Sequence, residues 1–384
     1  MRKLTTLIAT SAVAAMALAA CSGGIEETPD NSNGSNSNES AGNGQSNEDA
    51  IVIRYSTQHT DNTPFSTATA RWADLVKERT EGRVEIEMYY SESLLPADQV
   101  LPGIIDGRAE AGFVVDTMFA DLLPLTNASA IPFERQNGVA QALAFQEMYE
   151  NNEGYRAEFE ELGLHVLMFQ VPGASHIGSQ DEISTLDDLQ GQDIRCIGYI
   201  CDSLQAVGAN PVALASTEIY EAMDRGTIDG WSAYPFMDML ATQFQEVTPY
   251  VADPGMGMYL QTFSPINLDT WNSIEPQDQE VLTELAREYP DIMMEEIHNL
   301  EKATCEATTE AGVKLSQFSE ADQQEWNSTV HDDIFEKWTN LVNSNTDVDA
   351  QDFYSQLMAA YDEAEAATDF ESLYTACMEG ELAQ

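Results

Sequence analysis

Arg195 is the residue whose type and position point most directly to chemistry. It follows Asp193 and Ile194 in a short predicted strand and so lies at a strand end. A guanidinium offers two parallel donors that match a carboxylate, and it stays charged when buried. The chain holds 16 Lys and Arg against 66 Asp and Glu, and a buried Arg without an anion is costly. Two interpretations stay open: an anchor for an organic anion, or the simpler one, a structural ion pair with a neighbouring Asp or Glu.

Three aromatic residues, Trp231, Tyr234 and Phe236, follow the predicted turn Asp229-Gly230 within six positions. Their rings can stack on a flat or apolar ligand. Such residues more often belong to the core, so both roles stay open for each of them. Tyr234 is favoured as a ligand contact, because its hydroxyl can also orient a polar group.

Further candidates follow predicted strands. Gln58 and His59 come after the strand Ile51–Tyr55, and Asp116 comes after the strand Ala111–Val115. Ligand crevices in open α/β sheets lie beyond the carboxyl ends of the strands, so these positions favour ligand contact. Asp116 would repel an acid unless it binds a ligand hydroxyl or a cation.

The elements that position these residues alternate between strand and helix. The strand Ile51–Tyr55 precedes a helix that Thr63 can cap and in which Pro64 suits the first position. A strand at Val84–Met88 and a buried strand at Ala111–Val115 follow. The same alternation returns in the predicted strands Leu164–Phe169, Asp193–Ile197 and Ile228–Ser232. The pattern predicts an open α/β fold.

A long helix is predicted over Pro276–Thr308. Pro290 lies inside it, and an internal proline costs about 3 kcal/mol unless the helix kinks or breaks. We therefore expect either a kink or two helices.

The N-terminus is expected to be a targeting segment. Arg2 and Lys3 precede the short apolar run Leu4–Leu18, which is too short to span a bilayer. The run ends in small residues before Cys21, like a bacterial lipoprotein signal, which implies cleavage after residue 20 and lipid on the Cys21 thiol. The alternative is ordinary secretion with Cys21 as a spare thiol. Residues 21–49 are rich in Ser, Gly, Asn and Glu and predict a flexible tether.

Four further cysteines remain. They allow three pairings, and disulfides persist outside the cell. We expect the near pair Cys196–Cys201 and the far pair Cys305–Cys377. A disulfide at the near pair would stiffen the chain beside Arg195 and reduce the ordering cost of binding. It would also place Tyr199 in a braced loop, as a candidate ligand contact. A zinc site is weakly supported, because no Cys-x-x-Cys or paired-His spacing occurs.

Charge and motifs exclude several function classes. The formal net charge of −50 argues against nucleic acid and against docking on anionic lipid. No Gly-x-Ser-x-Gly, His-Glu-x-x-His or Gly-x-x-x-x-Gly-Lys motif occurs, so we expect no enzyme of those classes and no cofactor. The chain has so many carboxylates that their number does not exclude a catalytic pair of acids. Three alternatives stay open: an enzyme acting on an organic acid, a receptor for an ATP-driven importer or a sensor, and a structural surface protein.

An ordered series of motifs resembles the DctP-type solute receptors of TRAP transporters, the tripartite ATP-independent periplasmic systems. The motifs occur in the family's order over roughly residues 51–340. They are Trp72–Val84, Ile104–Glu110, Ile131–Phe133, Asp188–Arg195, Val207–Val212, Glu218–Gly230 and Ile266–Trp271. Each motif alone is weak, and their ordered succession is strong.

The resemblance implies a site. The family Arg that matches Arg195 pairs with the ligand carboxylate, which favours the anchor over the structural ion pair. A second family Arg is missing, since Ser175 stands where some members carry it, and the adjacent His176 could donate instead. This departure suggests a ligand with one carboxylate. The segment of Trp231, Tyr234 and Phe236 reaches the cleft in the family. Some relatives bind a metal ion with the substrate, and nothing in the sequence fixes that here.

The resemblance also implies the architecture. We expect a two-lobed α/β fold with interleaved lobes, mixed sheets, crossing strands and one long connecting helix. Lobe I would comprise residues 51–171 and about 258–290, and lobe II residues 172–257 and about 291–384. The expected function is extracytoplasmic: a lipid-anchored receptor would capture a small organic anion and deliver it to the integral membrane subunits of a transporter driven by an ion gradient.

Overall fold

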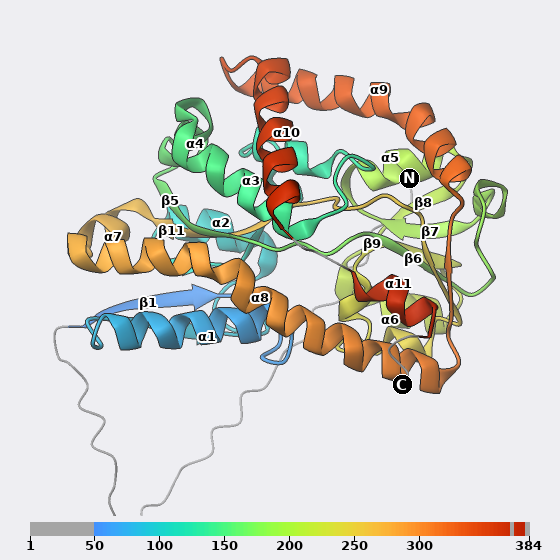
Figure 1. Cartoon of the computed structure of the whole chain (residues 1–384), viewed down its shortest axis with the longest axis horizontal. Helices are drawn as coiled ribbons and strands as arrows, with labels where there is room; N and C mark the ends of the chain where they lie inside the picture. The colour runs from blue at the N-terminus through green and yellow to red at the C-terminus, as the bar shows by residue number, and fades with distance from the viewer. Residues whose placement is uncertain (1–49, 369–371, 381–384) are drawn as a thin grey trace, which may run out of the picture. The chain divides into compact units, whose positions relative to one another are not determined.

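Two six-stranded mixed sheets form the body of the chain (Figure 1). The computed structural model describes residues 50–368 and 372–380, so the predictions for the signal segment, Cys21 and the tether lie outside the described residues. We call the first sheet and the helices on it lobe I, and the second sheet with its helices lobe II. The predicted α/β class with mixed sheets is confirmed.

The first sheet has the order β2-β1-β3-β11-β4, and β5 pairs with β11. Its strands are β1 (Ile51–Ser56), β2 (Val84–Tyr89), β3 (Ala111–Gly112), β4 (Val114–Val115), β5 (Leu164–Gln170) and β11 (Thr262–Asn267). The second sheet has the order β12-β10-β6-β9-β7-β8. Its strands are β6 (His176–Ser179), β7 (Asp193–Cys196), β8 (Asn210–Ala213), β9 (Gly230–Tyr234), β10 (Tyr250–Asp253) and β12 (Lys314–Gln317).

Eleven α-helices lie among the described residues, with short 3-10 helices between them. The α-helices are α1 (Pro64–Arg79), α2 (Ala97–Ile105), α3 (Gly138–Asn151), α4 (Glu153–Glu160), α5 (Gly198–Ala206), α6 (Ile219–Asp224), α7 (Leu268–Ser273), α8 (Pro276–Ala311), α9 (Glu320–Asn345), α10 (Ala350–Ala367) and α11 (Leu373–Met378). The 3-10 helices used below are η1 (Asp116–Phe119), η2 (Thr126–Ala130) and η5 (Phe236–Asp238).

The chain passes between the two sheets three times: from β5 to β6, from β10 to β11, and along α8. Figure 1 shows α8 running from α1 and α7 at one end to α11 at the other, and it packs against α1, β5, η5 and α11. The lobes are therefore interleaved. The predicted lobe boundaries stay a prediction, and α10, which we assigned to lobe II, packs against α3 of lobe I.

Helix α1 begins as its sequence predicts. The side chain of Thr63 accepts a hydrogen bond from the Ser66 N–H, and Pro64 occupies the first turn. Helix α8 differs from one of our expectations. It runs without interruption through the buried Pro290, so the alternative of two separate helices is wrong.

The predicted single strand Ala111–Val115 is also wrong, because it divides into β3 and β4. Both pieces pair with β11 in one register, which places Pro265 of β11 opposite Gly112. Proline has no N–H to donate to a ladder. The pairing is therefore interrupted at this point, while β3 keeps its parallel partner β1.

Both predicted disulfides are present. Cys196 and Cys201 join the end of β7 to α5 over a sequence separation of 5. Cys305 and Cys377 join α8 to α11 over a separation of 72. The second bond therefore closes a far longer loop, and it lies in the smaller apolar core, which also contains Trp231 and Tyr374.

The two disulfides should contribute unequally to stability. Loop-closure entropy predicts that Cys305→Ser with Cys377→Ser lowers the free energy of unfolding by about 4 kcal/mol, and Cys196→Ser with Cys201→Ser by about 2 kcal/mol. Equilibrium unfolding in guanidinium chloride measures both. Equal losses, or a larger loss for the short loop, would contradict the expectation.

Candidate functional site

Arg195 lies at the carboxyl ends of the strands of lobe II, as its sequence position predicts. It is the third residue of β7, in register with Trp231 of β9. Its side chain is 4% exposed. Nε donates to the Leu214 carbonyl at 2.9 Å, and Nη1 donates to the carbonyls of Ser232 and Ala233 at 3.2 and 3.1 Å. The guanidinium therefore ties the ends of β8 and β9 to β7 through backbone oxygens.

No Asp or Glu among the described residues lies within ion-pair distance of Arg195. Its Nη2 group likewise makes no hydrogen bond with a residue in the described part of the chain. Burial lowers the pKa of Arg195, and the hydroxyls of Tyr259 and Tyr234 oppose that shift. A guanidinium stays protonated in proteins even so. The structural ion pair that the sequence left open is therefore not the arrangement found.

The residue Ala233 links Arg195 to Ser175. Its carbonyl accepts from Arg195, and its N–H donates to the Ser175 Oγ at 3.1 Å. Ala233 has φ 54°, a left-handed conformation that is unfavourable for a residue with a Cβ. Ser175 is completely buried, and its hydroxyl holds the strained backbone under Arg195.

A second buried guanidinium, Arg135, was missed by sequence reasoning. It is completely buried, and its Nε donates to the Gln141 Oε1 at 2.9 Å. Its Nη2 donates to the carbonyls of Ala128, Ser129 and Ile131 at 2.8, 3.0 and 3.2 Å. Arg135 thus closes the turn around η2. Its place two residues after the motif Ile131–Phe133 was the available signal.

Two tyrosines, Tyr234 and Tyr259, lie near the guanidinium of Arg195. Tyr234 packs against Phe244 with ring centroids 5.0 Å apart, and burial raises its pKa well above the ordinary value. Tyr259, which sequence reasoning missed, is 6% exposed and has its pKa raised by burial. Asp238 affects the pKa of both tyrosines. Burial raises the pKa of Asp238 itself to about 7, and its Oδ1 has no partner among the described residues.

Trp231 belongs to the core of lobe II. It is completely buried, and its Nε1 donates to the Thr248 Oγ1 at 3.0 Å. Its ring lies so close to Gly178 that no Cβ would fit there. This packing favours the core role of Trp231 over ligand contact, the two roles that the sequence left open.

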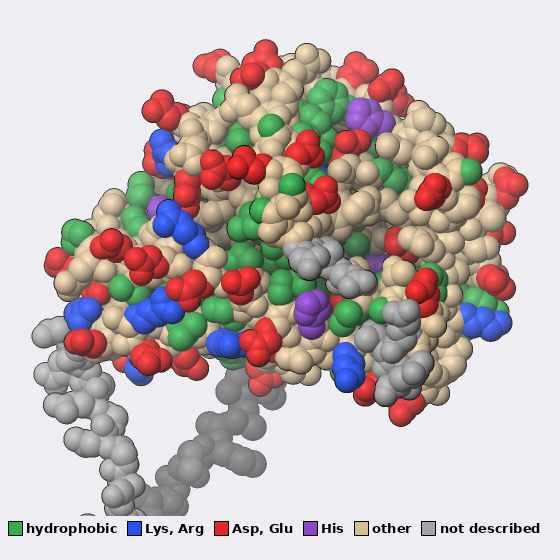
Figure 2. All heavy atoms as spheres, viewed as in Figure 1, with side chains coloured by type: hydrophobic (Ala, Val, Ile, Leu, Met, Phe, Trp, Pro, Cys, Tyr) green, Lys and Arg blue, Asp and Glu red, His purple; other side chains and the backbone are tan. Residues whose placement is uncertain are grey.

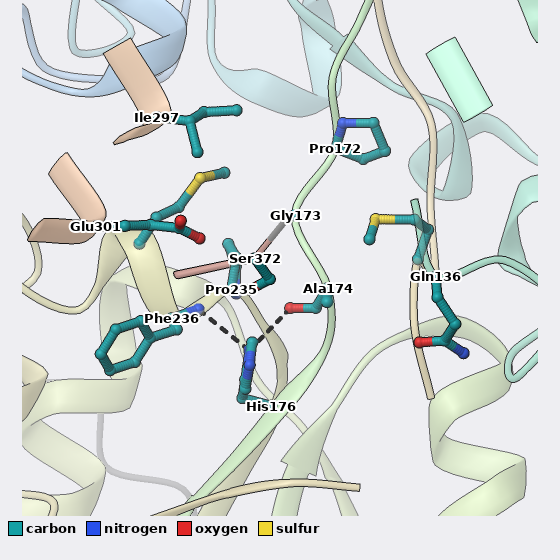
Figure 3. Close-up of a pocket in the computed structure, with 12 residues that line it drawn as sticks. Gln136, Pro172, Gly173, Ala174, His176, Pro235, Phe236, Ile297, Glu301 and Ser372 are labelled. Atoms are coloured by element: carbon teal, nitrogen blue, oxygen red, sulfur yellow. Dashed lines mark hydrogen bonds between the residues drawn. The ribbon is translucent and has the colours of Figure 1, made fainter. Parts of the chain in front are cut away.

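His176 and Phe236 line a small cavity beside the crossing strands (Figure 3). Its volume is about 30 Å³, room for one or two waters. Figure 3 shows Glu301 of α8 on one side and Gln136 on the other. Burial raises the pKa of Glu301 to about 7. Arg195 is not part of the lining, and the cavity has room for only one or two waters, so we do not place the anion site there.

The imidazole of His176 is held at one nitrogen. The Phe236 N–H donates to Nδ1 at 3.2 Å, and the Ala174 carbonyl lies 3.1 Å from the same atom. One tautomer satisfies only one of these two groups. Burial lowers the pKa of His176. The ligand contacts of His176 and Phe236 stay predictions. In this structure both residues line the small cavity.

Asp116 lies at the start of η1, directly after β4. Its Oδ1 accepts from the N–H groups of Thr117 and Gln261 at 2.7 and 3.0 Å, and the Ser129 hydroxyl donates to Oδ2. Burial raises its pKa to about 7, against the opposing charge of Arg135. These contacts explain why the acid of Asp116 is buried, because it holds the loop together. A ligand contact of Asp116 stays a prediction.

His59 contributes an aromatic surface at the end of β1. Its ring stacks on Phe65 at 5.1 Å and meets Phe113 edge-on at 4.6 Å. Burial lowers its pKa to about 4, so it is neutral at pH 7. Its Nε2 is buried without a partner among the described residues. Gln58, next to it, is half-buried. Neither residue adds a second cation to the site.

Tyr199 lies in α5, inside the loop that the Cys196–Cys201 disulfide closes. It is half-buried, and burial raises its pKa to about 12, with Asp202 and Asp116 adding to the shift. No group of three or more His, Cys, Asp or Glu side chains in the described part of the chain could hold a metal ion. None of the described helices is long and apolar enough to cross a membrane.

The buried Asp238 should make stability depend on pH. Its folded pKa of about 7 exceeds its ordinary value of 3.8, so between these values the folded state binds more protons than the unfolded state. The free energy of unfolding therefore falls as pH rises from about 4 to about 7. Asp238→Asn should flatten this slope and stabilise the protein at pH 8, on the order of a few kcal/mol. Denaturation series at several pH values measure the free energy of unfolding and its slope with pH.

The exposed Asp224→Asn removes one negative charge from the same lobe and serves as the control. It should leave the slope nearly unchanged. An Asp238→Asn variant with the same slope as the control would show that Asp238 is ionised in the fold.

Comparison with known proteins identifies the family. Residues 55–339 match the family described as bacterial extracellular solute-binding protein, family 7. A monocarboxylate 2-oxoacid-binding periplasmic protein of Nostoc sp. is 25% identical over 75% of this chain and 78% of its own length.

Solved structures show the same fold. A TRAP periplasmic solute binding protein from Desulfovibrio salexigens has a TM-score of 0.73 at 24% identity, over 85% of this chain and 99% of its own. A TRAP solute binding protein from Rhodoferax ferrireducens, in complex with benzoate, has a TM-score of 0.73 at 19% identity, over 83% and 99%. These similarities confirm the expected two-lobed architecture. The chain belongs to family 7 of the bacterial extracellular solute-binding proteins, the DctP family that its ordered motifs resemble.

Proposed function

We propose that this protein captures a small organic anion outside the cytoplasm and delivers it to a TRAP transporter driven by an ion gradient. The observation that carries the proposal is the buried guanidinium of Arg195, which has three bonds to backbone carbonyls and no carboxylate partner among the described residues. A guest carboxylate on Nη2 would supply the missing negative charge. The family supports the partnership with integral membrane subunits.

The number of cations in the site supports a ligand with one carboxylate. Ser175 replaces the second family Arg and is bonded to the backbone of Ala233. His59 is neutral because burial lowers its pKa, and the donors of Arg135 serve the turn around η2. The names of two similar proteins, a 2-oxoacid-binding protein and one in complex with benzoate, fit the same chemistry.

Long-range electrostatics makes a positive charge inside the site necessary for anion capture. Figure 2 shows Asp and Glu side chains spread over the visible face, with Lys and Arg most frequent near α1 and α8. Two of those cations are paired with acids: Arg71 with Glu295 at 2.5 Å, and Arg79 with Glu288 at 2.7 Å. A molecule with a formal charge of −50 repels anions at a distance, so capture depends on a positive group inside the site.

The proposal includes binding without turnover. The relatives and solved structures reported above are solute-binding proteins. Reversible binding with recovery of the unaltered acid supports the receptor, whereas turnover would favour an enzyme.

Arg195→Ala should abolish most of the affinity for the acid. A thermal-shift screen that includes pyruvate, lactate, benzoate and gluconate identifies an acid that stabilises the wild type. Calorimetry should then show a loss of several kcal/mol in Arg195→Ala, because the ligand charge would be desolvated without a partner. Arg195→Lys should also weaken binding, because the planar pair of donors is lost.

The matched control is Arg225→Ala, which removes one positive charge from an exposed position of lobe II. It should bind the acid like the wild type. Unchanged affinity in a folded Arg195→Ala variant would refute the assignment of the anchor.

We also propose that the mature protein begins at a lipidated Cys21 and is anchored through the lipid alone. The apolar run that ends in Leu18-Ala19-Ala20 before Cys21 supports this. In fractionated cells, wild-type protein should sediment with membranes and a Cys21→Ser variant should not. Equal membrane association of both proteins would contradict the anchor.

A further inference from the structure

The loop after Arg195 is unusually constrained. Cys196, the last residue of β7, is bonded to Cys201 in the first turn of α5. Between them, Gly198 adopts a left-handed conformation with φ 53°. The disulfide removes much of the conformational freedom that a short loop would otherwise have. We call residues 196–201 the bridged turn.

The bridged turn of lobe II touches lobe I. A Cβ placed on Gly198 would lie 3.9 Å from the methyl group of Thr117, which follows Asp116 in η1. Helix α5 also packs against η2, the next short helix of lobe I. The proximity of Tyr199 to Asp116 agrees with this, since the acid raises the pKa of the tyrosine. The hydroxyl of Thr117 is buried here without a partner among the described residues.

The opposite side of α5 is held by α9. The Trp326 Nε1 donates to the Ser203 carbonyl at 2.9 Å, and the Lys337 Nζ lies 2.6 Å from the Asp202 Oδ1. Helix α9 reaches lobe I as well, where the Trp338 Nε1 donates to the Pro124 carbonyl at 2.9 Å. Helix α9 therefore holds the part of α5 that follows the bridged turn, while the turn itself lies next to the η1 segment and to Arg195.

We propose that the bridged turn is a latch: it docks on residues Asp116–Thr117 of lobe I and holds the two lobes together beside Arg195, and the Cys196–Cys201 disulfide keeps it in the docking conformation. The benefit to ligand retention rests on the proposed function. The contact itself does not, because it is made by side chains and backbone of this chain alone.

Hydrogen exchange read by mass spectrometry tests the latch on the body of the protein. Amides of residues 116–123 belong to the opposite lobe, 73 or more positions away in sequence from the bridged turn. In Cys196→Ser with Cys201→Ser, their exchange should accelerate about tenfold, because loss of the docking contact exposes η1. Exchange in β1 and α1 should not change. The comparison is made without ligand and again with pyruvate and with benzoate.

Two further variants make the result decisive. Cys305→Ser with Cys377→Ser removes the other disulfide and should accelerate exchange in α11 but not in residues 116–123. Tyr199→Ala keeps the Cys196–Cys201 disulfide, weakens the docking surface, and should accelerate exchange in residues 116–123 even if the cysteine variant fails to fold. Unchanged exchange of this segment in Tyr199→Ala and in the folded cysteine variant, in every ligand condition, would overturn the latch. Acids that change exchange in no variant would instead count against the proposed function.

Discussion

The buried guanidinium of Arg195, whose Nη2 has no partner among the described residues, is the feature on which the account of this site depends. The guanidinium of Arg195 is 4% exposed, and backbone carbonyls of Leu214, Ser232 and Ala233 take its donors on two of three nitrogens. Carbonyl dipoles compensate a cation in part, whereas a carboxylate would do so fully. In a chain with 66 acidic residues, Arg195 pairs with none of those described, and the guest that we propose would bring the missing negative charge.

The fold positions this guanidinium by bringing strand ends together. β7 and β9 are parallel neighbours, and β8 is parallel to β7, so their carboxyl ends meet where the guanidinium lies. The strained Ala233 places its carbonyl toward Arg195 while Ser175 holds its N–H. The two crossing segments and α8 then connect this edge to lobe I. Positioning of the anchor is thus a property of the whole interleaved body.

The sequence predicted the residues whose physical signal is local. The capped start of α1, the mixed α/β class and the position of Arg195 at a strand end all follow from short-range patterns, and both disulfides agree with the expected pairing. The family itself was predicted from the order of the motifs, and the match over residues 55–339 confirms it.

What the sequence could not supply were contacts between distant segments. Tyr259 carries no local signal for burial, and the charged groups that act on it, Arg195 and Asp238, lie in other segments of the chain. The break between β3 and β4 lies where Pro265 of β11, from the other half of the body, interrupts the pairing. The placement of His176 and Phe236 around a small acidic cavity depends on Glu301 of α8. Each is set by the interleaving of the lobes.

The most direct test of the central claim is a crystal structure of the body grown with an acid that raises its melting temperature. The account predicts that Nη2 of Arg195 donates to the acid's carboxylate while Nε and Nη1 keep their backbone partners. A carboxylate bound elsewhere, with Arg195 turned onto an Asp or Glu of the chain, would contradict it.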